Sequence, residues 1–284
     1  MSKWRPSEKN CIYVVPDIQG ALGLFEKICA RILPLRKSDG GKDMLILLGD
    51  FIDRHVDSHK TLDFLIDLKK KYPDQVVMIK GNHEQIFLNV MNLEPGKNLT
   101  LQSRKHYHDM WLANGGIETL MGYMDRAGIK DVSPLTFPQF RIVDIVPKEH
   151  IEFLTTQLVD YYKLDKYVFV HGGYNPTYPV EEHEPSHLYW DRDLIRYVQK
   201  AVNNNKPEDI FWNETIVTGH NGSMPYLHDK FMMLDAGSPR QLLLLELNSM
   251  EAFMAYPNKK RLVKYNLQKH TPRQSRPVFR RVDS

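Results

Sequence analysis

The chain has 284 residues, a length at which a single α/β domain is common. Its 42% hydrophobic and 26% charged residues are typical of a folded globular protein and exclude a predominantly disordered chain. A formal net charge of +3 is too small to indicate a nucleic-acid-binding protein by itself.

Cysteine content and hydropathy favour a protein of the cytoplasm. The two cysteines, Cys11 and Cys29, provide neither a disulfide framework nor a zinc-binding spacing, so we expect reduced thiols. The first ten residues, MSKWRPSEKN, lack the apolar core of a signal peptide, and no run approaches the roughly 18 to 20 apolar residues of a membrane span. We therefore expect a cytoplasmic protein with no membrane partner.

The first third of the chain contains three apolar runs that predict buried strands, at residues 12–15, 44–48 and 76–79. Helical patterns follow the first two runs at residues 21–33 and 58–71, and the third run ends in KGNHE. This repetition predicts an α/β sheet with parallel strands. Ligands bind at the carboxyl ends of the strands in such sheets.

The rest of the chain is predicted to contain a cap, more strands and a tail. Residues 94–147 read as a mostly helical cap segment, and short strands are predicted at 167–170, 216–218, 231–234 and 241–247. Between Lys259 and Arg281 there are nine Lys and Arg and no Asp or Glu. We therefore divide the chain into a domain of residues 1–256 and a basic, flexible tail of residues 257–284. Contact of the tail with nucleic acid or an acidic partner stays open beside a merely solvated terminus.

Five predicted strands end in side chains that can bind a metal. In chain order these ends carry Asp17 and Gln19; Asp50, Asp53 and Arg54; Asn82 and His83; His171; and His220. Any one of them alone is typical of a turn or of a buried polar residue. Five such ends in order are not explained by turns, and mixed oxygen and imidazole donors suit Mn, Fe or Zn. The sequence therefore predicts a metal site.

These motifs resemble those of the calcineurin-like metallophosphoesterases. Residues 49–54 fit the pattern GDxxDR, residues 81–84 fit GNHE, and HGG and GH occur at His171 and His220. More narrowly, the chain resembles phosphoprotein phosphatases, in particular bacterial and phage serine/threonine phosphatases, over about residues 11–248. The resemblance implies an α/β fold with a central β-sandwich of mixed sheets, flanked by helices and carrying the helical cap.

The resemblance also implies a ligand set for two divalent metals, with Mn preferred and Fe or Zn as alternatives. Asp17 and Gln19 would hold the first metal, Asp50 would bridge both, and Asn82, His171 and His220 would hold the second. A hydroxide bridging the two metals would attack phosphorus in line.

Five residues receive roles in substrate binding and proton transfer from the same resemblance. His83 would act as general acid, oriented by Asp53. Arg54 and Arg192 would bind phosphate oxygens, with the ligand Asn82 beside them. For Arg192, the interpretation as a surface arginine stays open.

Departures from the family pattern bear on the substrate. Gln19 stands where the family usually has a metal-binding histidine, and its amide oxygen is a weaker, neutral donor. Glutamine here also resembles some diadenosine tetraphosphate hydrolases, whereas Glu84 fits the phosphatases. His55 replaces a glycine after Arg54, and we expect it to be exposed.

Three functions are therefore considered. The leading one is two-metal hydrolysis of phosphomonoesters on a phosphorylated protein, most like a protein serine/threonine phosphatase. The alternatives are a hydrolase of diadenosine tetraphosphate or a related nucleotide, and a pseudophosphatase that binds without catalysis.

Overall fold

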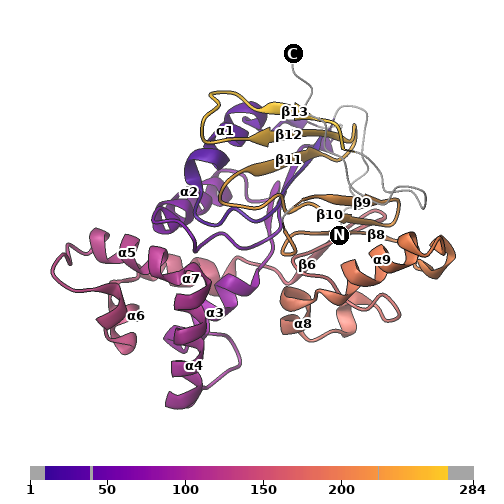
Figure 1. Ribbon diagram of the computed structural model, residues 1–284. Helices are drawn as coiled ribbons and strands as arrows, with labels where there is room; N and C mark the ends of the chain where they lie inside the picture. The colour runs from indigo at the N-terminus through magenta and orange to yellow at the C-terminus, as the bar shows by residue number, and fades with distance from the viewer. Residues whose placement is uncertain (1–9, 39–40, 223, 268–284) are drawn as a thin grey trace.

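Two mixed β-sheets stack face to face between layers of helices in the computed structural model, which describes residues 10–38, 41–222 and 224–267 (Figure 1). Buried strand residues fill the space between the sheets, among them Val14 and Ile46 from one sheet and Phe169 and Val217 from the other. The expected β-sandwich flanked by helices is confirmed.

The larger sheet has the strand order β13-β12-β11-β1-β4-β5 within the described residues. Its strands are β1 (Ile12–Val15), β4 (Met44–Leu47), β5 (Val76–Met78), β11 (Leu242–Glu246), β12 (Glu251–Ala255) and β13 (Val263–Tyr265). Strands β1, β4 and β5 are parallel, with Val14 opposite Ile46. Strand β11 pairs with β1 in the antiparallel direction, which makes the sheet mixed.

The smaller sheet has the order β6-β7-β8-β10-β9 among the residues described. Its strands are β6 (Tyr161–Leu164), β7 (Tyr167–Val170), β8 (Thr215–Thr218), β9 (Tyr226–His228) and β10 (Phe231–Met233). Strands β7, β8 and β10 run parallel, and β6 and β9 flank them in the antiparallel direction. Strands β2 (Lys37–Ser38) and β3 (Gly41–Lys42) pair in the antiparallel direction as a separate two-stranded sheet.

Helices cover the outer face of each sheet (Figure 1). Helices α1 (Leu22–Ile32) and α2 (Ser58–Lys71), both close to the predicted ranges, pack on the larger sheet. In α1 the buried residues include Leu24, Phe25 and Ile28, the spacing of an amphipathic helix. Helices α8 (Pro185–Trp190) and α9 (Asp193–Asn203) pack on the smaller sheet.

The segment predicted as a cap is helical and lies beside the end of the larger sheet (Figure 1). Its neighbour α3 (Asn82–Met91) begins at the GNHE turn, and α4 (Leu101–Trp111), α5 (Ile117–Arg126), α6 (Ile142–Ile145) and α7 (Lys148–Thr156) follow. Gly115, between α4 and α5, has φ +99°, and a Cβ there would lie 2.5 Å from Cγ of Arg54. This glycine therefore lets the cap backbone contact Arg54.

The folded domain extends past residue 256, where we had placed the start of the tail. Strand β13 pairs with β12 at the edge of the larger sheet. Val263 and Tyr265 are partly buried while Lys264 is exposed, an alternation that the basic composition obscured. The remainder of the predicted tail, residues 268–284, lies outside the described residues. Within the part of the chain that the structure describes, no helix combines the length and apolarity needed to cross a membrane.

Candidate metal centre

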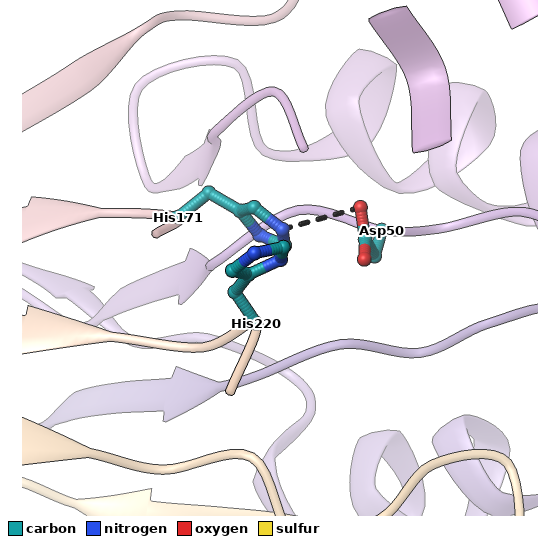
Figure 2. Close-up of side chains that lie close together, drawn as sticks. All are labelled: Asp50, His171 and His220. Atoms are coloured by element: carbon teal, nitrogen blue, oxygen red, sulfur yellow. Dashed lines mark ion pairs between the residues drawn. The ribbon is translucent and has the colours of Figure 1, made fainter. Parts of the chain in front are cut away.

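The side chains predicted as metal ligands converge where parallel strands of both sheets end. Asp50 follows β4, His171 follows β7 and His220 follows β8, and one potential ligand atom from each lies within 4.8 Å of the others. Figure 2 shows the two imidazole rings gathered beside the Asp50 carboxylate. All three residues are buried, so the cluster is shielded from solvent.

Asn82 joins this cluster through His171. The Nδ1–H of His171 donates to the backbone carbonyl of Leu48 at 2.7 Å, which leaves Nε2 facing the other ligands. Nε2 lies 3.0 Å from Oδ1 of Asn82 and 3.3 Å from Oδ1 of Asp50. A hydrogen bond that fixes the far ring nitrogen is the usual way proteins orient a metal-binding histidine.

Asp17 and Gln19, the residues predicted for the first metal, lie at the end of β1. Oδ1 of Asp17 accepts a hydrogen bond from the backbone N–H of His220 at 2.9 Å. A Cβ at Gly219 would lie 2.2 Å from this oxygen, so glycine is needed for the close approach. The two predicted ligand groups therefore adjoin each other.

Two buried side-chain atoms of this centre have no hydrogen-bond partner among the described residues. They are Oε1 of Gln19 and Nε2 of His220. A buried polar atom without a partner destabilises the folded state by about 1–3 kcal/mol. Both atoms carry lone pairs that a cation could accept, so the centre fits a bound metal, and the fit extends to Gln19.

The electrostatics of the centre also favour a cation. Burial, together with the nearby Asp235, raises the pKa of Asp17 well above its usual range. Burial would lower the pKa of His171, but the Asp50 carboxylate outweighs it and raises the pKa to about 10. Burial likewise opposes ionisation of Asp50, yet the charges of His171 and His83 hold its pKa well below normal. The raised pKa values of Asp17 and His171 both reflect carboxylates held close together away from solvent, and divalent ions would neutralise the charge of such carboxylates.

His83 and Asp53 form a buried pair beside these ligands. Nδ1–H of His83 donates to Oδ2 of Asp53 at 2.7 Å, while Nε2 lies 3.7 Å from Oδ2 of Asp50. The other Asp53 oxygen accepts hydrogen bonds from Trp111 Nε1 at 2.9 Å and Thr119 Oγ1 at 2.7 Å. Burial lowers the pKa of His83, but the charges of Asp50 and Asp53 outweigh it and raise the pKa to about 9. The ring is thus held protonated in one orientation.

Arg54 lies beside His83, and Arg192 lies near His220. A terminal guanidinium nitrogen of Arg54 is 3.3 Å from Nε2 of His83. Arg192 is exposed before α9; burial chiefly lowers the pKa of His220, and the charges of His171 and, to a smaller extent, Arg192 lower it further. His55 is 40% exposed at its side chain, and its Nδ1 accepts from the backbone N–H of Asp57.

Glu84 has a structural role that its sequence context did not indicate, since this fully buried carboxylate joins two of the loops. It accepts hydrogen bonds from the backbone N–H groups of Asp50 at 2.9 Å, Phe51 at 2.7 Å and Gly81 at 2.9 Å. The signal available in the sequence was a charged residue shortly before the apolar residues Ile86, Phe87 and Leu88. Trp111 and Thr119, which hold Asp53, were also missed.

Comparison with known proteins gives the family. Residues 12–236 match the model of the calcineurin-like phosphoesterase family. The serine/threonine-protein phosphatase sitA of Aspergillus fumigatus is 44% identical over 52 residues, 16% of this chain and 13% of that protein. The serine/threonine-protein phosphatase 4 catalytic subunit of Eremothecium gossypii is 45% identical over 79 residues, 28% of this chain and 26% of that protein. The chain therefore aligns with only a minor part of each relative.

Two solved structures share the fold at low sequence identity. A serine/threonine phosphatase from Saccharomyces cerevisiae with similarity to human PP5 has a TM-score of 0.53 and 14% identity, covering 91% of this chain and 83% of that one. A candidate diadenosine tetraphosphatase has a TM-score of 0.51 and 16% identity, covering 90% and 98%. The chain belongs to the calcineurin-like phosphoesterase family, a family of hydrolases that act on phosphoric esters.

Proposed function

We propose that the protein is a metal-dependent phosphomonoesterase that acts on phosphorylated serine or threonine in proteins. The observation that carries this proposal is the buried His83–Asp53 pair, 2.7 Å apart, placed between the metal-type cluster and Arg54. Hydrolysis of an alkyl phosphate needs an attacking water, a bound phosphate and a proton for the leaving oxygen. The residues around this pair can serve all three needs.

The metal ligands divide into two groups around Asp50. Asp17, Gln19 and Asp50 would hold one divalent ion, and Asp50, Asn82, His171 and His220 the other. When bound, such a pair of ions would supply an acidified water and neutralise phosphate charge. The mixture of oxygen and imidazole donors suits Mn, with Fe or Zn as alternatives.

His83 would give the proton that the leaving alkoxide requires. Its Nδ1–H is committed to Asp53, so the ring cannot rotate without breaking a 2.7 Å hydrogen bond, and Nε2 stays on the side of Arg54. Positioned proton transfer of this kind accelerates reactions by roughly a hundred- to ten-thousandfold. The planar guanidinium of Arg54 would bind phosphate oxygens through two parallel hydrogen bonds, with Arg192 as a second contact.

A protein substrate is supported by two observations. Glu84 completes GNHE as in the phosphatases that this sequence resembles, and it fixes the loops that carry Asp50 and Asn82. The curated relatives named above are serine/threonine-protein phosphatases, although the aligned segments are short.

The runner-up function is hydrolysis of a dinucleoside polyphosphate, and Gln19 is the observation that favours it. The unpartnered amide oxygen of Gln19 lies where the resembled phosphatases have an imidazole. A weaker donor at the first metal would suit a substrate whose own phosphate oxygens complete the coordination.

One assay separates these functions. Purified protein with Mn²⁺ is given a phosphoserine peptide and diadenosine tetraphosphate under the same conditions. We expect the peptide to be preferred. A preference for the dinucleotide above about a hundredfold in kcat/KM, roughly 2.7 kcal/mol, would refute the proposal. Absence of hydrolysis with fewer than one metal bound per chain would instead indicate a pseudophosphatase.

A further inference from the structure

A cavity of about 440 Å³ lies beside the metal centre, and no step of the proposed reaction uses it. Its wall contains the aromatic side chains of Tyr174, Tyr197, Phe211 and Trp212, together with the carboxylates of Asp191 and Asp193. None of the described residues that line it is a lysine or an arginine. We call it the α9 cavity, because Asp193, Leu194 and Tyr197 belong to that helix.

The α9 cavity is lined by residues that lie next to those of the metal centre in the chain. Asp191 lies directly between Trp190 and Arg192 in the chain, and the Trp190 ring meets the His220 ring edge-on at 6.4 Å between centroids. A Cβ on Gly173, two residues after His171, would lie 2.7 Å from Oδ1 of Asp191. A substrate bound at the metal centre could therefore extend into the cavity.

The cavity presents aromatic surface that the fold itself does not bury. Phe211 is 56% exposed and Tyr197 is 44% exposed, whereas Trp212 is buried. The centroids of the Phe211 and Trp212 rings are 5.8 Å apart, and those of Tyr197 and Trp212 are 6.4 Å apart. Large apolar side chains gathered on a surface commonly mark a site of interaction.

Charge selects among the ligands that could bind there. Asp193 is paired with Arg196 at 3.0 Å on the surface, so we take Asp191 as the carboxylate that would attract a cationic ligand. Residues 181–214, which contain α9 and the cavity wall, include eight Asp and Glu against four Lys and Arg. Aromatic faces and carboxylates both attract cations. The same carboxylates would repel the phosphates of a nucleotide.

We propose that the α9 cavity binds a lysine or arginine side chain of the phosphorylated protein substrate, close in sequence to the phosphorylated residue. This inference rests on the proposed function, because it assigns a recognition element to that substrate. An extended peptide advances about 3.3–3.6 Å per residue. One peptide can therefore place its phosphate at the metal centre and a nearby basic residue in the adjoining cavity.

The test compares phosphoserine peptides that differ only in one residue, arginine or glutamine, at each position near the phosphoserine. At the best position we expect arginine to raise kcat/KM by about three- to tenfold, the size of a favourable cation–aromatic contact. Phe211→Ala and Asp191→Asn should each bring the ratio close to one. The asparagine can still accept the hydrogen bond that Leu194 N donates to Asp191 at 3.0 Å, so this variant removes charge while keeping the turn. Thermal unfolding of each variant checks that the fold is retained.

Tyr178→Ala is the matched control, since Tyr178 is 55% exposed and does not line the cavity. It should leave the arginine-to-glutamine ratio unchanged. An equal ratio in wild type and Phe211→Ala would overturn the proposal. So would a Phe211→Ala defect confined to diadenosine tetraphosphate, which would make the occupant a nucleobase.

A second measurement separates failure of this inference from failure of the proposed function. Binding of the same peptides without phosphate is followed by isothermal titration to wild type and to Phe211→Ala. If phosphopeptides are not hydrolysed but the arginine peptide still binds more tightly and depends on Phe211, the cavity assignment holds and the phosphatase assignment fails. Equal binding of the arginine and glutamine peptides to both proteins would refute the cavity assignment.

Discussion

Asp53→Asn should disable proton donation by His83 while leaving the metal ligands in place. The asparagine oxygen can keep the hydrogen bonds from Trp111 and Thr119 that Oδ1 of Asp53 now accepts. Its amide nitrogen would then face Nδ1 of His83, which is now 2.7 Å from Oδ2 of Asp53. Because an N–H group donates, Nδ1 would have to accept, and His83 would become a neutral ring. A neutral imidazole is a poor acid, since giving up its remaining proton leaves an imidazolate.

The size of the effect depends on the leaving group. For a phosphoserine peptide, whose alkoxide leaves only with a proton, we expect kcat to fall by about a hundred- to ten-thousandfold, the full contribution of general acid catalysis. For 4-nitrophenyl phosphate, whose phenolate leaves without a proton, we expect less than about a tenfold fall, because the metal centre and Arg54 remain. Loss of one charged hydrogen-bond partner should also reduce the free energy of unfolding by about 1–3 kcal/mol.

The assay is steady-state kinetics of both substrates on wild type and Asp53→Asn, with metal content and thermal unfolding measured on the same samples. Equal losses on the two substrates, with metal content unchanged, would refute the assignment of His83 as general acid. Loss of metal would show instead that the Asp53–His83 pair supports the ligand cluster rather than the leaving group.

Three further predictions follow from the same site and from the cap. Gln19→His should tighten Mn²⁺ binding by on the order of tenfold, measured by metal titration; unchanged affinity would show that residue 19 is not a ligand. Glu84→Gln should lower the free energy of unfolding by about 3 kcal/mol in denaturant titration, since backbone N–H groups now bonded to the carboxylate would face an amide nitrogen. A change below about 0.5 kcal/mol would show that Glu84 does not stabilise the two loops. Burial lowers the pKa of His150, whose Nε2–H donates to Asp63 at 2.9 Å. In the unfolded chain His150 regains its usual pKa of 6.5, so below that pH the unfolded state binds more protons than the folded state. The free energy of unfolding should therefore fall as the pH falls through 6.5. His150→Gln should flatten this fall in Tm whereas His106→Gln, at an exposed position, should not; equal slopes would contradict the reasoning.

The parts of the fold that were predictable from sequence are those with a local signal. The strands that lead to Asp17 and Asp50, β1 and β4, are apolar runs, because parallel strands in the middle of a sheet are buried on both faces. Strand β5, which leads to Asn82, lies at the edge of the sheet and is an apolar run as well. Strand β12, with the sequence EAFMA, was missed because these residues favour helix, and its conformation is set by antiparallel pairing with β11. Strand β6 was missed because, at the sheet edge, three of its four residues remain partly exposed or exposed.

The residues of the candidate site likewise fall into those that a local sequence pattern predicts and those that it does not. The convergence of Asp50, His171 and His220 could be expected because each lies at the end of an apolar run, and the order of these motifs along the chain matches a known family. The hydrogen bond from Thr119 to Asp53 links residues 66 positions apart, and that from Trp111 links residues 58 apart. Contacts of such separation arise from how α4 packs against α3 and α5 against α2, and no local pattern encodes them. The α9 cavity likewise brings together residues from three separate segments.

Backbone conformation explains why the loops of the site need such long-range support. Five residues that carry its functional side chains have positive φ angles: Gln19 (47°), Asp50 (50°), Asp53 (74°), Arg54 (60°) and His220 (64°). Each such conformation destabilises a residue other than glycine by on the order of 1–3 kcal/mol. The N–H groups of Ile18 and Gln19 both donate to the carbonyl of Asp50, at 3.0 and 2.7 Å, while the Glu84 carboxylate accepts a hydrogen bond from the Asp50 N–H. These bonds offset the strain and hold the ligands in place before any metal binds. Weakening them at Glu84 should therefore reduce metal affinity as well as stability, although Glu84 is not itself a proposed ligand.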